Sequence, residues 1–304
     1  MRLVLARPTC APHTSLVSTS LQFTAAVLLA LATSVPGAAD AGIYTLVEGD
    51  VRVLRGTTWL KVVPGARAEE GDIVEAGEHG NVQLELSGGA TINMHGPAAF
   101  FASGIFVADN KPAVAADITI QRGWLKCAAS GKQALRVRAG SLGVDLVQAI
   151  VVLNVDARSA DMFVESGTAK VVVQPARAKT PSTHEAAAGE YLSRSGADAP
   201  LVATRPSSAF ISGMPREYRD PLPLLAPRFA KAAPELEPLR EITLAEAEPW
   251  LAGSNRRVFL KRFAPRLSDA TFRAGIIARP TMFPEWDRIV RPERYRPKEK
   301  DSVN

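Results

Sequence analysis

The chain has 304 residues, of which 46% are hydrophobic and 22% are charged, and it contains 22 Gly and 22 Pro. This composition excludes an intrinsically disordered chain, and the many turn-forming residues favour short strands over a helical bundle. The sequence has two Cys and four His, which excludes a Cys/His zinc cluster, because Cys10 lies in a segment that we expect to be removed. We therefore expect one thiol, no internal disulfide, no metal and no cofactor in the mature protein.

The N-terminal segment, residues 1–41, has the features of a bacterial signal peptide. Arg2 and Arg7 provide a basic start, Phe23 to Val35 is an apolar run, and Ala39 to Ala41 is a small-x-small cleavage site. A membrane anchor is the alternative, but the apolar run is shorter than the ~20 residues that a spanning helix needs. We expect cleavage near Ala39 to Ala41, a periplasmic mature protein, and no transmembrane anchor after cleavage.

Residues 42–192 alternate apolar and polar side chains in short runs, which glycine-containing turns separate. A period of two is typical of strands with one buried face, and glycine supplies the positive φ of tight hairpin turns. The pattern predicts a mainly β fold, an antiparallel β-sandwich or barrel-like domain. In one predicted strand Leu125 and Cys127 share a face, so we expect a buried, unreactive thiol. The alternating runs include Val51–Val53, Val82–Leu86, Ile118–Ile120, Leu135–Val137 and Val171–Val173.

Residues 193–240 are rich in Pro, Gly and Ala, and we interpret them as a linker to a small helical, Pro- and Arg-rich C-terminal region, residues 241–304. Charge divides the chain in a similar way. Residues 42–213 hold 16 Lys and Arg against 17 Asp and Glu, whereas residues 214–304 hold 18 against 13. The excess positive charge of the mature protein therefore lies in its C-terminal part.

Three short helices are predicted in the C-terminal region. Ser254 or Asn255 can cap the first, Ser268 can cap the second, and Pro284 fits the first turn of the third. Because so few residues bury little apolar surface by themselves, we expect this region to dock on the β domain or on a partner. The apolar side chains expected to share a helix face are Phe259 with Phe263, Phe272 with Ile276, and Trp286 with Ile289 and Val290.

The same predicted helices carry basic side chains among aromatic ones, and the candidate partner-binding residues are Arg256, Arg257, Lys261, Arg262 and Trp286. A guanidinium group binds carboxylate or phosphate in bidentate fashion and stacks on aromatic rings. The predicted partner is an envelope protein or an anionic envelope polymer, and not nucleic acid, which an exported protein rarely meets. The alternative is a solvated helix surface whose aromatic side chains form a small core.

Catalytic motifs are not convincing in this sequence. The run Ala139–Gly143 resembles a nucleophile elbow, but that motif needs Gly two residues before the Ser, where this chain has Ala. The run Ser130–Lys132 resembles the end of a phosphate loop without the first glycine of that motif, and we interpret it as a hairpin turn. His79 and His95 each precede a glycine and are interpreted as turn or loop histidines. We therefore assign no catalytic residue.

The β region contains an ordered series of short motifs. They are Gly49–Gly56, Gly71–Val74, Asn81–Leu86, Arg122–Leu125, Phe163–Gly167 with Val171–Val173, and Ala188–Glu190. In this order they resemble the periplasmic domain of the ferric-citrate regulator (FecR) family over about residues 43–192, and the C-terminal region lies outside the resemblance. The resemblance implies a periplasmic protein-binding module. Signalling members of the family have a cytoplasmic anti-sigma segment and a transmembrane helix ahead of this domain. In this chain we expect a signal peptide ahead of the domain instead, so we do not expect a transmembrane sigma-factor regulator.

These observations favour an exported, non-enzymatic module of the cell envelope, in signalling or envelope organisation. In this hypothesis the β domain recognises a protein or an envelope polymer, and the basic C-terminal region docks on it or extends the site. The alternative is an envelope-acting hydrolase whose catalytic carboxylates come together only in the folded protein. A cleft that holds two carboxylates, or a His paired with one carboxylate, would favour the hydrolase.

Overall fold

The computed structural model describes residues 42–105, 114–174, 180–196, 198–231, 233–253 and 255–295. All of these residues belong to one compact unit, Ala38–Asn304. The expected signal peptide in residues 1–41 and the candidate helix cap Ser254 lie outside the described residues. No helix within the described ranges is long and apolar enough to cross a membrane.

Strands dominate the described part of the chain, which confirms the mainly β fold that the alternating pattern predicts. The strand pairs described are antiparallel, except that β7 and β8 run parallel. The strands of the first half of the chain are β1 (Gly42–Glu48), β2 (Val51–Arg55), β3 (Thr58–Lys61), β4 (Ile73–Ala76), β5 (Asn81–Leu86), β6 (Ala90–Ile105), β7 (Val114–Ala129) and β8 (Ala134–Ala139). Those of the second half are β9 (Leu142–Leu146), β10 (Ala149–Val155), β11 (Ser159–Ser166), β12 (Thr168–Val173), β13 (Ser182–Ala187), β14 (Tyr191–Ser195), β15 (Leu201–Ala203) and β16 (Glu237–Glu241).

Two long strands, β6 and β7, each run through both layers of a sandwich. The first half of β6 pairs with β5 and its second half pairs with β4, while β7 pairs with β8 through its first half and with β10 through its second half. Each strand bends between its halves. At the bend of β7, Gly123 has a φ of +92°, and a side chain there would collide with the carbonyl oxygen of Pro97.

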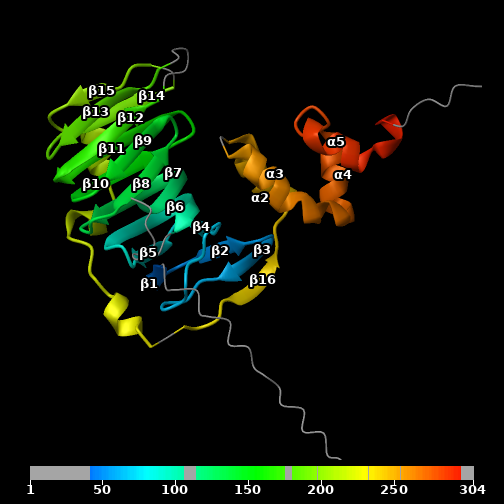
Figure 1. Ribbon diagram of the computed structural model, residues 1–304, viewed down its shortest axis with the longest axis horizontal. Coiled ribbons are helices and arrows are strands. Elements are labelled where there is room, and N and C mark those ends of the chain that lie inside the picture. The colour runs from blue at the N-terminus through cyan, green and yellow to red at the C-terminus, as the bar shows by residue number, and fades with distance from the viewer. Residues whose placement is uncertain are drawn as a thin grey trace, which may run out of the picture. The chain divides into compact units, whose positions relative to one another are not determined.

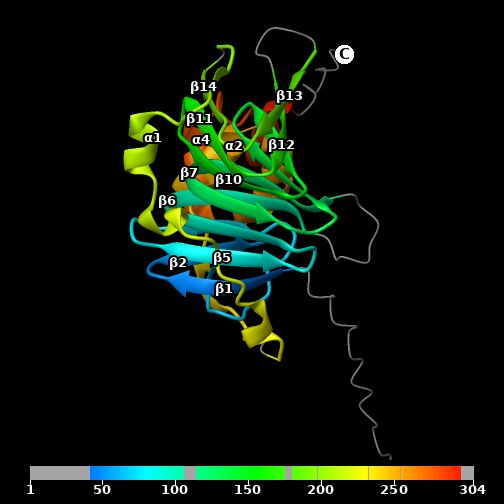
Figure 2. The same ribbon diagram turned by 90° about the vertical axis from the view of Figure 1, so that its left-hand side faces the viewer.

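The resulting first layer contains β1, β5, β10, β11, β14 and β15 with one half of each long strand, and several of these strands lie side by side in Figure 2. The second layer contains β2, β3, β4, β8, β9, β12, β13 and β16 with the other halves. Alternate side chains of both layers form one apolar core, for example Leu84 and Leu153 from the first layer and Val53 and Val137 from the second. Of the two predicted architectures, the sandwich is therefore the one that the structure adopts.

Residues 207–229, which we call the strap, cross the outer face of the first layer. The strap contains helix α1 (Ser208–Gly213) and the 3-10 helices η1 (Arg216–Arg219) and η2 (Ala226–Phe229). Phe210 packs its ring on Trp124 and Tyr191, with ring centroids 4.9 and 5.3 Å apart. The buried hydroxyl of Tyr218 donates to the carbonyl oxygen of Asn93 at 2.9 Å. This part of the segment interpreted as a linker is thus packed on the sheet.

The strap is also held by charged side chains that are buried beneath it. Lys126 is 1% exposed, and its ammonium group donates to the carbonyl oxygens of Tyr218 at 2.7 Å and Asp220 at 3.0 Å. The Glu85 carboxylate accepts from the backbone N–H groups of Leu225 at 2.7 Å and Ala226 at 3.0 Å. These bonds satisfy groups that would be costly to bury alone.

After the strap the chain passes to the second layer, where β16 pairs with β3 at the sheet edge (Figure 1). The helices that follow are α2 (Leu244–Ala252), α3 (Arg256–Phe263), η3 (Ala264–Ser268), α4 (Ala270–Ala278), α5 (Pro284–Val290) and η4 (Pro292–Tyr295). They bury an apolar cluster against the outer face of β2, β3, β4 and β6, to which the sheet contributes Leu54, Trp59, Ile73, Ala99 and Phe101. We call this the outer cluster. The C-terminal region docks on the β domain, as the short predicted helices led us to expect.

Details of the helices differ from the sequence prediction. Phe259 and Phe263 do lie on one buried face of α3. The cap of α4 is Asp269 and not Ser268, because the Asp269 carboxylate accepts from the backbone N–H of Phe272 at 2.8 Å. In α5, Ile289 is 59% exposed and does not join Trp286 in the outer cluster. Helix α2 was not predicted.

Candidate functional site

The outer face of the second layer is divided into a covered part and an uncovered part. The C-terminal helices cover β2, β3 and β4, whereas the outward side chains of β8, β9, β12 and β13 face solvent. Arg138, Lys170 and Glu185 are exposed there, while Val137 and Val171 beside them point inward and are buried. The uncovered part is polar, as expected for a sheet face in contact with water.

The strand register places opposite charges side by side on this uncovered face. Asp117, Arg136, Asp145, Lys170 and Glu185 occupy one row across five strands, so that the sign of the charge alternates. The Nε of Arg136 donates to Oδ1 of Asp145 at 2.8 Å, and this hydrogen bond raises the pKa of Arg136. Cross-strand pairs of this kind stabilise the sheet by modest amounts.

An open groove runs between helix α3 and strand β8. It has a volume of about 920 Å³, with Asn255 and Val258 on the helical wall and Asp117, Arg136 and Arg138 on the sheet wall. The two arginines also line a neighbouring depression over β9. We call the larger hollow the α3–β8 groove.

The exposed face of α3 carries positive charge. Arg257, Val258 and Lys261 are exposed, and their spacing places Lys261 next to the other two on the helix surface. Neither Arg257 nor Lys261 forms an ion pair within the part of the chain that the structure describes. These two predicted site residues are therefore exposed cationic groups on the helix whose Val258 lines the α3–β8 groove, and neither is itself among the residues that line it.

Arg262, another predicted site residue, fixes α3 to the sheet. Its guanidinium donates to the carbonyl oxygens of Leu54 and Gly56 at 2.6 Å each, and also to that of Gly71. Burial lowers the pKa of Arg262 to about 10, although the negative charge of Asp72 acts to raise it. Because its donors are occupied by carbonyl oxygens of the sheet, Arg262 positions helix α3 and is not free to bind a ligand.

Arg256 and Trp286, the remaining predicted site residues, also have partners inside the C-terminal region. The guanidinium of Arg256 pairs with Glu285 at 2.6 Å and donates to the carbonyl oxygen of Leu251 at 2.6 Å. Trp286 is 3% exposed and stacks on Phe283. The structure thus brings the four basic residues together on α3, places Trp286 apart on α5, and exposes Arg257 and Lys261.

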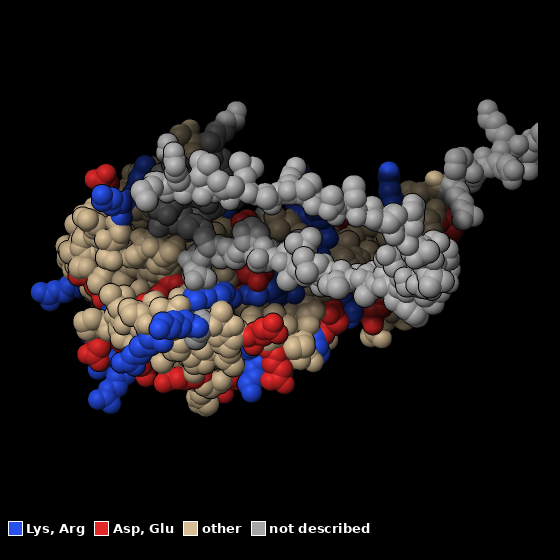
Figure 3. All heavy atoms as spheres, turned by 60° about the horizontal axis from the view of Figure 1, so that its bottom comes forward, with Lys and Arg blue, Asp and Glu red and all other residues tan. Residues whose placement is uncertain are grey.

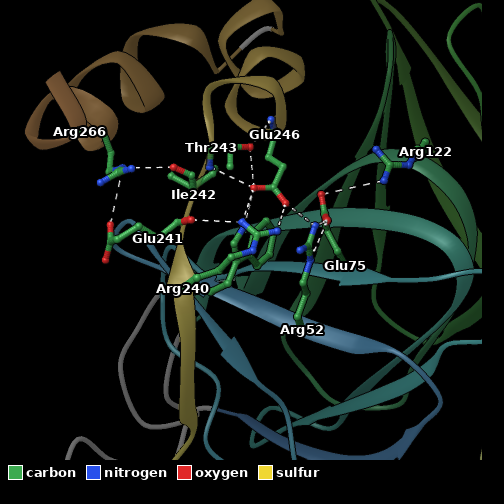
Figure 4. A network of polar contacts seen from close by, with 10 residues as sticks. Arg52, Glu75, Arg122, Arg240, Glu241, Ile242, Thr243, Glu246 and Arg266 are labelled. Atoms are coloured by element: carbon green, nitrogen blue, oxygen red, sulfur yellow. Dashed lines mark hydrogen bonds and ion pairs between the residues drawn. The ribbon is translucent and has the colours of Figure 1, made fainter. Parts of the chain in front are cut away.

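A polar network at Glu246 holds α2 against the sheet (Figure 4). The Glu246 carboxylate pairs with Arg240 at 2.7 Å and with Arg52 at 2.9 Å, and it accepts from the indole N–H of Trp59 at 3.3 Å. It also accepts from the backbone N–H of Thr243, which completes a capping box. The hydrogen bonds from Arg240, with those from Thr243, hold the pKa of Glu246 well below its usual range.

Outside the groove, the side chains that could take part in catalysis or bind a metal are buried, lie beside another side chain, or are not grouped. Cys127 is buried, as predicted, and burial raises the pKa of its thiol. One ring nitrogen of His95 lies 3.9 Å from the Glu217 carboxylate, and His184 lies 3.3 Å from Glu190. Within the described ranges, no three His, Cys, Asp or Glu side chains are grouped as a metal site would require.

The surface charge is mixed. On the face shown in Figure 3, Lys and Arg side chains lie among Asp and Glu side chains outside the grey atoms. The net charge of +5 is therefore not displayed on this face as one continuous basic patch. Local pairs of cations, such as those beside the α3–β8 groove, are the more informative feature.

Several residues that shape the site were missed by the sequence analysis. Thr243 and Glu246 have the spacing of a capping box, so helix α2 could have been recognised. Arg136 and Arg138 alternate with buried residues in a predicted strand, which indicates outward side chains but not their proximity to α3. That proximity follows from long-range packing.

Comparisons with known proteins find structural similarity over part of the chain and no sequence relative. No protein-family model and no curated protein matches the chain. Two crystal structures of a "putative anti-sigma factor" from Parabacteroides distasonis ATCC 8503 are similar to 46% of this chain, each with 11% sequence identity. Their TM-scores are 0.37 and 0.36, and the match spans 64% and 65% of those chains.

Proposed function

We propose that this chain is an exported, non-enzymatic binding module of FecR type that recognises a carboxylate-bearing envelope polymer through the α3–β8 groove. The order of motifs across residues 43–192 supports the family, and residues 1–41 support export. An acidic protein is the other partner that the groove chemistry would accept. The polymer is favoured because the groove is open and lined by charged side chains, whereas the centres of protein interfaces are depleted in charge.

The observation that carries the proposal is a pair of cationic side chains on the sheet wall of a groove whose other wall is formed by helix α3. Arg136 and Arg138 line the groove from the sheet, and α3 carries two further exposed cations, Arg257 and Lys261, outside the residues that line it. Guanidinium groups bind carboxylates through two parallel hydrogen bonds, and a Lys ammonium adds a compact charge. A strand of an acidic polymer that lies in the groove and continues over α3 would meet both pairs of cationic side chains.

The ion pairs on the sheet wall do not prevent binding. Arg138 lies 2.6 Å from Asp117, and both arginines of the wall are about two-fifths exposed or more. Exposed pairs of this kind contribute only about 0 to 1 kcal/mol. A ligand carboxylate can therefore replace Asp117 or Asp145 as the partner at little cost.

Co-sedimentation of the purified protein with insoluble peptidoglycan sacculi tests this proposal. We expect binding that weakens as salt is raised, because screening reduces contacts between exposed charges. Replacing Arg257 and Lys261 together by Gln should weaken binding about tenfold, at roughly 0.7 kcal/mol for each lost contact. The matched control is the pair Arg273→Gln and Arg288→Gln, which removes the same charge from exposed positions on α4 and α5.

Two outcomes of the co-sedimentation experiment would contradict the proposal. If the α3 variant and the control bind sacculi as tightly as the unmodified protein, the groove is not the binding site. If none of the proteins binds sacculi but an acidic envelope protein is retained through Arg257 and Lys261, the partner class is wrong and the site is right.

The hydrolase alternative has one observation in its favour, because Glu70 and Asp117 both line the α3–β8 groove. Asp117 is already paired with Arg138 at 2.6 Å, which suits a structural carboxylate. Release of soluble fragments from sacculi, lost in an Asp117→Asn variant, would establish the hydrolase. Our proposal expects no release from either protein.

A further inference from the structure

The hollow over strand β9, which we call the β9 depression, adjoins the α3–β8 groove on the uncovered face. It has a volume of about 280 Å³. Strand β8, which carries Arg136 and Arg138, lies between β7 on the side of the groove and β9 on the side of the depression. Because the two arginines line both hollows, a ligand that lies in the groove can continue across them onto β9.

The β9 depression is open because one position of β9 has no side chain. This position is Gly143, which lines the hollow and faces outward, since its neighbours Leu142 and Val144 are buried in the core. In the strand register Gly143 lies between Arg138 of β8 and Val172 of β12. The missing side chain therefore leaves a gap in the outward row directly beside Arg138.

Neither the backbone nor the packing of β9 requires glycine at position 143. The strand pairs in unbroken register with β8 and β12 through Gly143, and its φ is not positive. A Cβ there would meet only Val172, at 3.7 to 3.8 Å, which is ordinary contact. Gly140, which also lines the depression, differs because its φ of +57° suits the turn between β8 and β9. Glycine inside a strand often marks a bulge, a bend or the close approach of a ligand, and the unbroken pairing favours the last.

The charges that line the two hollows differ. The described residues that line the α3–β8 groove include Arg136 and Arg138 together with Glu70 and Asp117, so the charges balance. Those that line the β9 depression include the same two arginines but one carboxylate, Asp145, which leaves an excess of one positive charge. A ligand carboxylate is therefore better matched by the depression than by the groove.

Arg138 also has donors to spare. Its Nη2 lies 2.6 Å from the Asp117 carboxylate, on the side of β7, whereas its Nε and Nη1 form no hydrogen bond within the part of the chain that the structure describes. Its side chain is 46% exposed. Arg136, by contrast, already donates to Asp145 through two nitrogens, at 2.8 and 3.2 Å. A carboxylate above Gly143 would take its hydrogen bonds from Arg138.

We infer that the β9 depression is the subsite that holds a carboxylate of the bound polymer, and that Gly143 is the position that admits it. The inference rests on the proposed function for the nature of the ligand and adds where its acidic group is held. Ser141 and Gln174 also line the depression, and their side chains form no hydrogen bond among the described residues. They provide uncharged hydrogen-bonding groups for the part of the polymer next to its carboxylate.

The test is an NMR titration of the purified protein with tri-L-glutamate, and with tri-L-glutamine as the uncharged probe. Tri-L-glutamate, and not tri-L-glutamine, should shift the amide resonance of Gly143 and the Nε–H resonance of Arg138. Gly143→Val fills the depression and leaves the groove unchanged, because Gly143 is not among the residues that line the groove. It should weaken tri-L-glutamate binding about tenfold, the effect of losing two contacts between exposed charged groups.

The matched control is Thr183→Val, which places the same side chain in the same outward row but outside the depression, opposite Val172 on β13. It should leave affinity unchanged. Thermal denaturation establishes that both variants are folded, and Gly143→Val should unfold at no lower temperature than the unmodified protein, because valine suits a strand better than glycine. Should Gly143→Val not fold, Gly143→Ala replaces it and should weaken binding by a smaller factor.

Equal affinities of Gly143→Val and Thr183→Val would overturn the inference. Resonance shifts confined to residues of the groove, such as Gly104 and Val258, would also overturn it, as would absence of tri-L-glutamate binding up to ~10 mM. Failure of the proposed function gives a different result, in which sacculi are not bound but tri-L-glutamate still shifts Gly143. Conversely, equal binding of sacculi by the unmodified protein and Gly143→Val would leave the proposed function standing without this subsite.

Discussion

The two outer faces of the sandwich are covered by different means. The strap crosses the first layer and is held by buried polar groups, with Lys126 and Glu85 bonded to its backbone. The C-terminal helices cover part of the second layer through the apolar outer cluster, to which the sheet contributes the fully buried Trp59. Polar anchoring fixes one register of the strap, because only that register satisfies every buried group. Apolar packing supplies more of the free energy of docking.

This contrast bears on function. The first layer's outer face is occupied by the chain itself, whereas the second layer retains an uncovered half beside α3. Binding to an external ligand is therefore expected at the second layer.

Removing Trp59 from the outer cluster should have the largest effect. Trp59 is fully buried, lies under the guanidinium of Arg52 at 4.0 Å, and donates to Glu246. Trp59→Ala should cost about 3 to 5 kcal/mol, as for other buried aromatic residues. Hydrogen exchange should then accelerate throughout α2–α5 while the inter-layer core stays protected. Simultaneous unfolding of both regions in denaturant would show instead that they form one cooperative unit.

Breaking the polar anchor of the strap should have an intermediate effect. Lys126→Met keeps the length of the side chain but leaves the Tyr218 and Asp220 carbonyl oxygens and the Glu165 carboxylate without their donor. We expect a loss of about 2 to 3 kcal/mol and earlier proteolytic cleavage within residues 207–229. Lys170→Met, on the exposed sheet face, is the control and should change stability by less than about 0.5 kcal/mol.

The Glu246 network should give a smaller and pH-dependent effect. Glu246→Gln keeps the capping hydrogen bonds but removes the charge that pairs with Arg52 and Arg240, and should cost about 1 kcal/mol at neutral pH after solvent screening. The pKa of Glu246 is lowered in the folded protein. Its contribution is therefore present above the unfolded pKa of ~4.3 and is lost as pH falls below it. Urea unfolding of both proteins should show the difference shrinking in acid; a constant difference would contradict the assignment.

The smallest effect on stability is expected at the exposed basic side chains of α3. Arg257 and Lys261 are exposed and make no described ion pair. Replacing both by Gln should leave the free energy of unfolding within about 0.5 kcal/mol of the original while weakening binding to acidic ligands. Thermal denaturation measures the first and co-sedimentation the second. A marked loss of stability would mean that these side chains hold α3 in place, as Arg262 does.

The sequence allowed the inter-layer core to be predicted but not the coverings of the outer faces. Period-two patterning marks Val53, Val137 and Cys127 as inward-facing without knowledge of their neighbours. The strap has no such period, and its anchors join residues about 90 to 140 positions apart, such as Lys126 to Tyr218. Composition alone therefore favoured a linker in residues 193–240.

The candidate site was predicted in part for the same reason. Spacing on a helix identified a basic face on α3 but could not separate Arg262, which bonds to the sheet, from Lys261, which faces solvent. This difference between Arg262 and Lys261 depends on how α3 packs on the sheet. The predicted strand Leu135–Val137 contains Arg136, but its pattern does not show that Arg136 and Arg138 lie near α3, because α3 is brought there by contacts such as Trp59 to Glu246, 187 positions apart.

The central claim is that the second layer's uncovered face, beside α3, is the binding surface. Hydrogen exchange of the full chain with and without soluble peptidoglycan fragments tests it most directly. We expect slower exchange in α3 and β8 on binding, with exchange in residues 207–229 unchanged. Protection confined to the strap, or bound fragments that leave α3 and β8 unprotected, would contradict it.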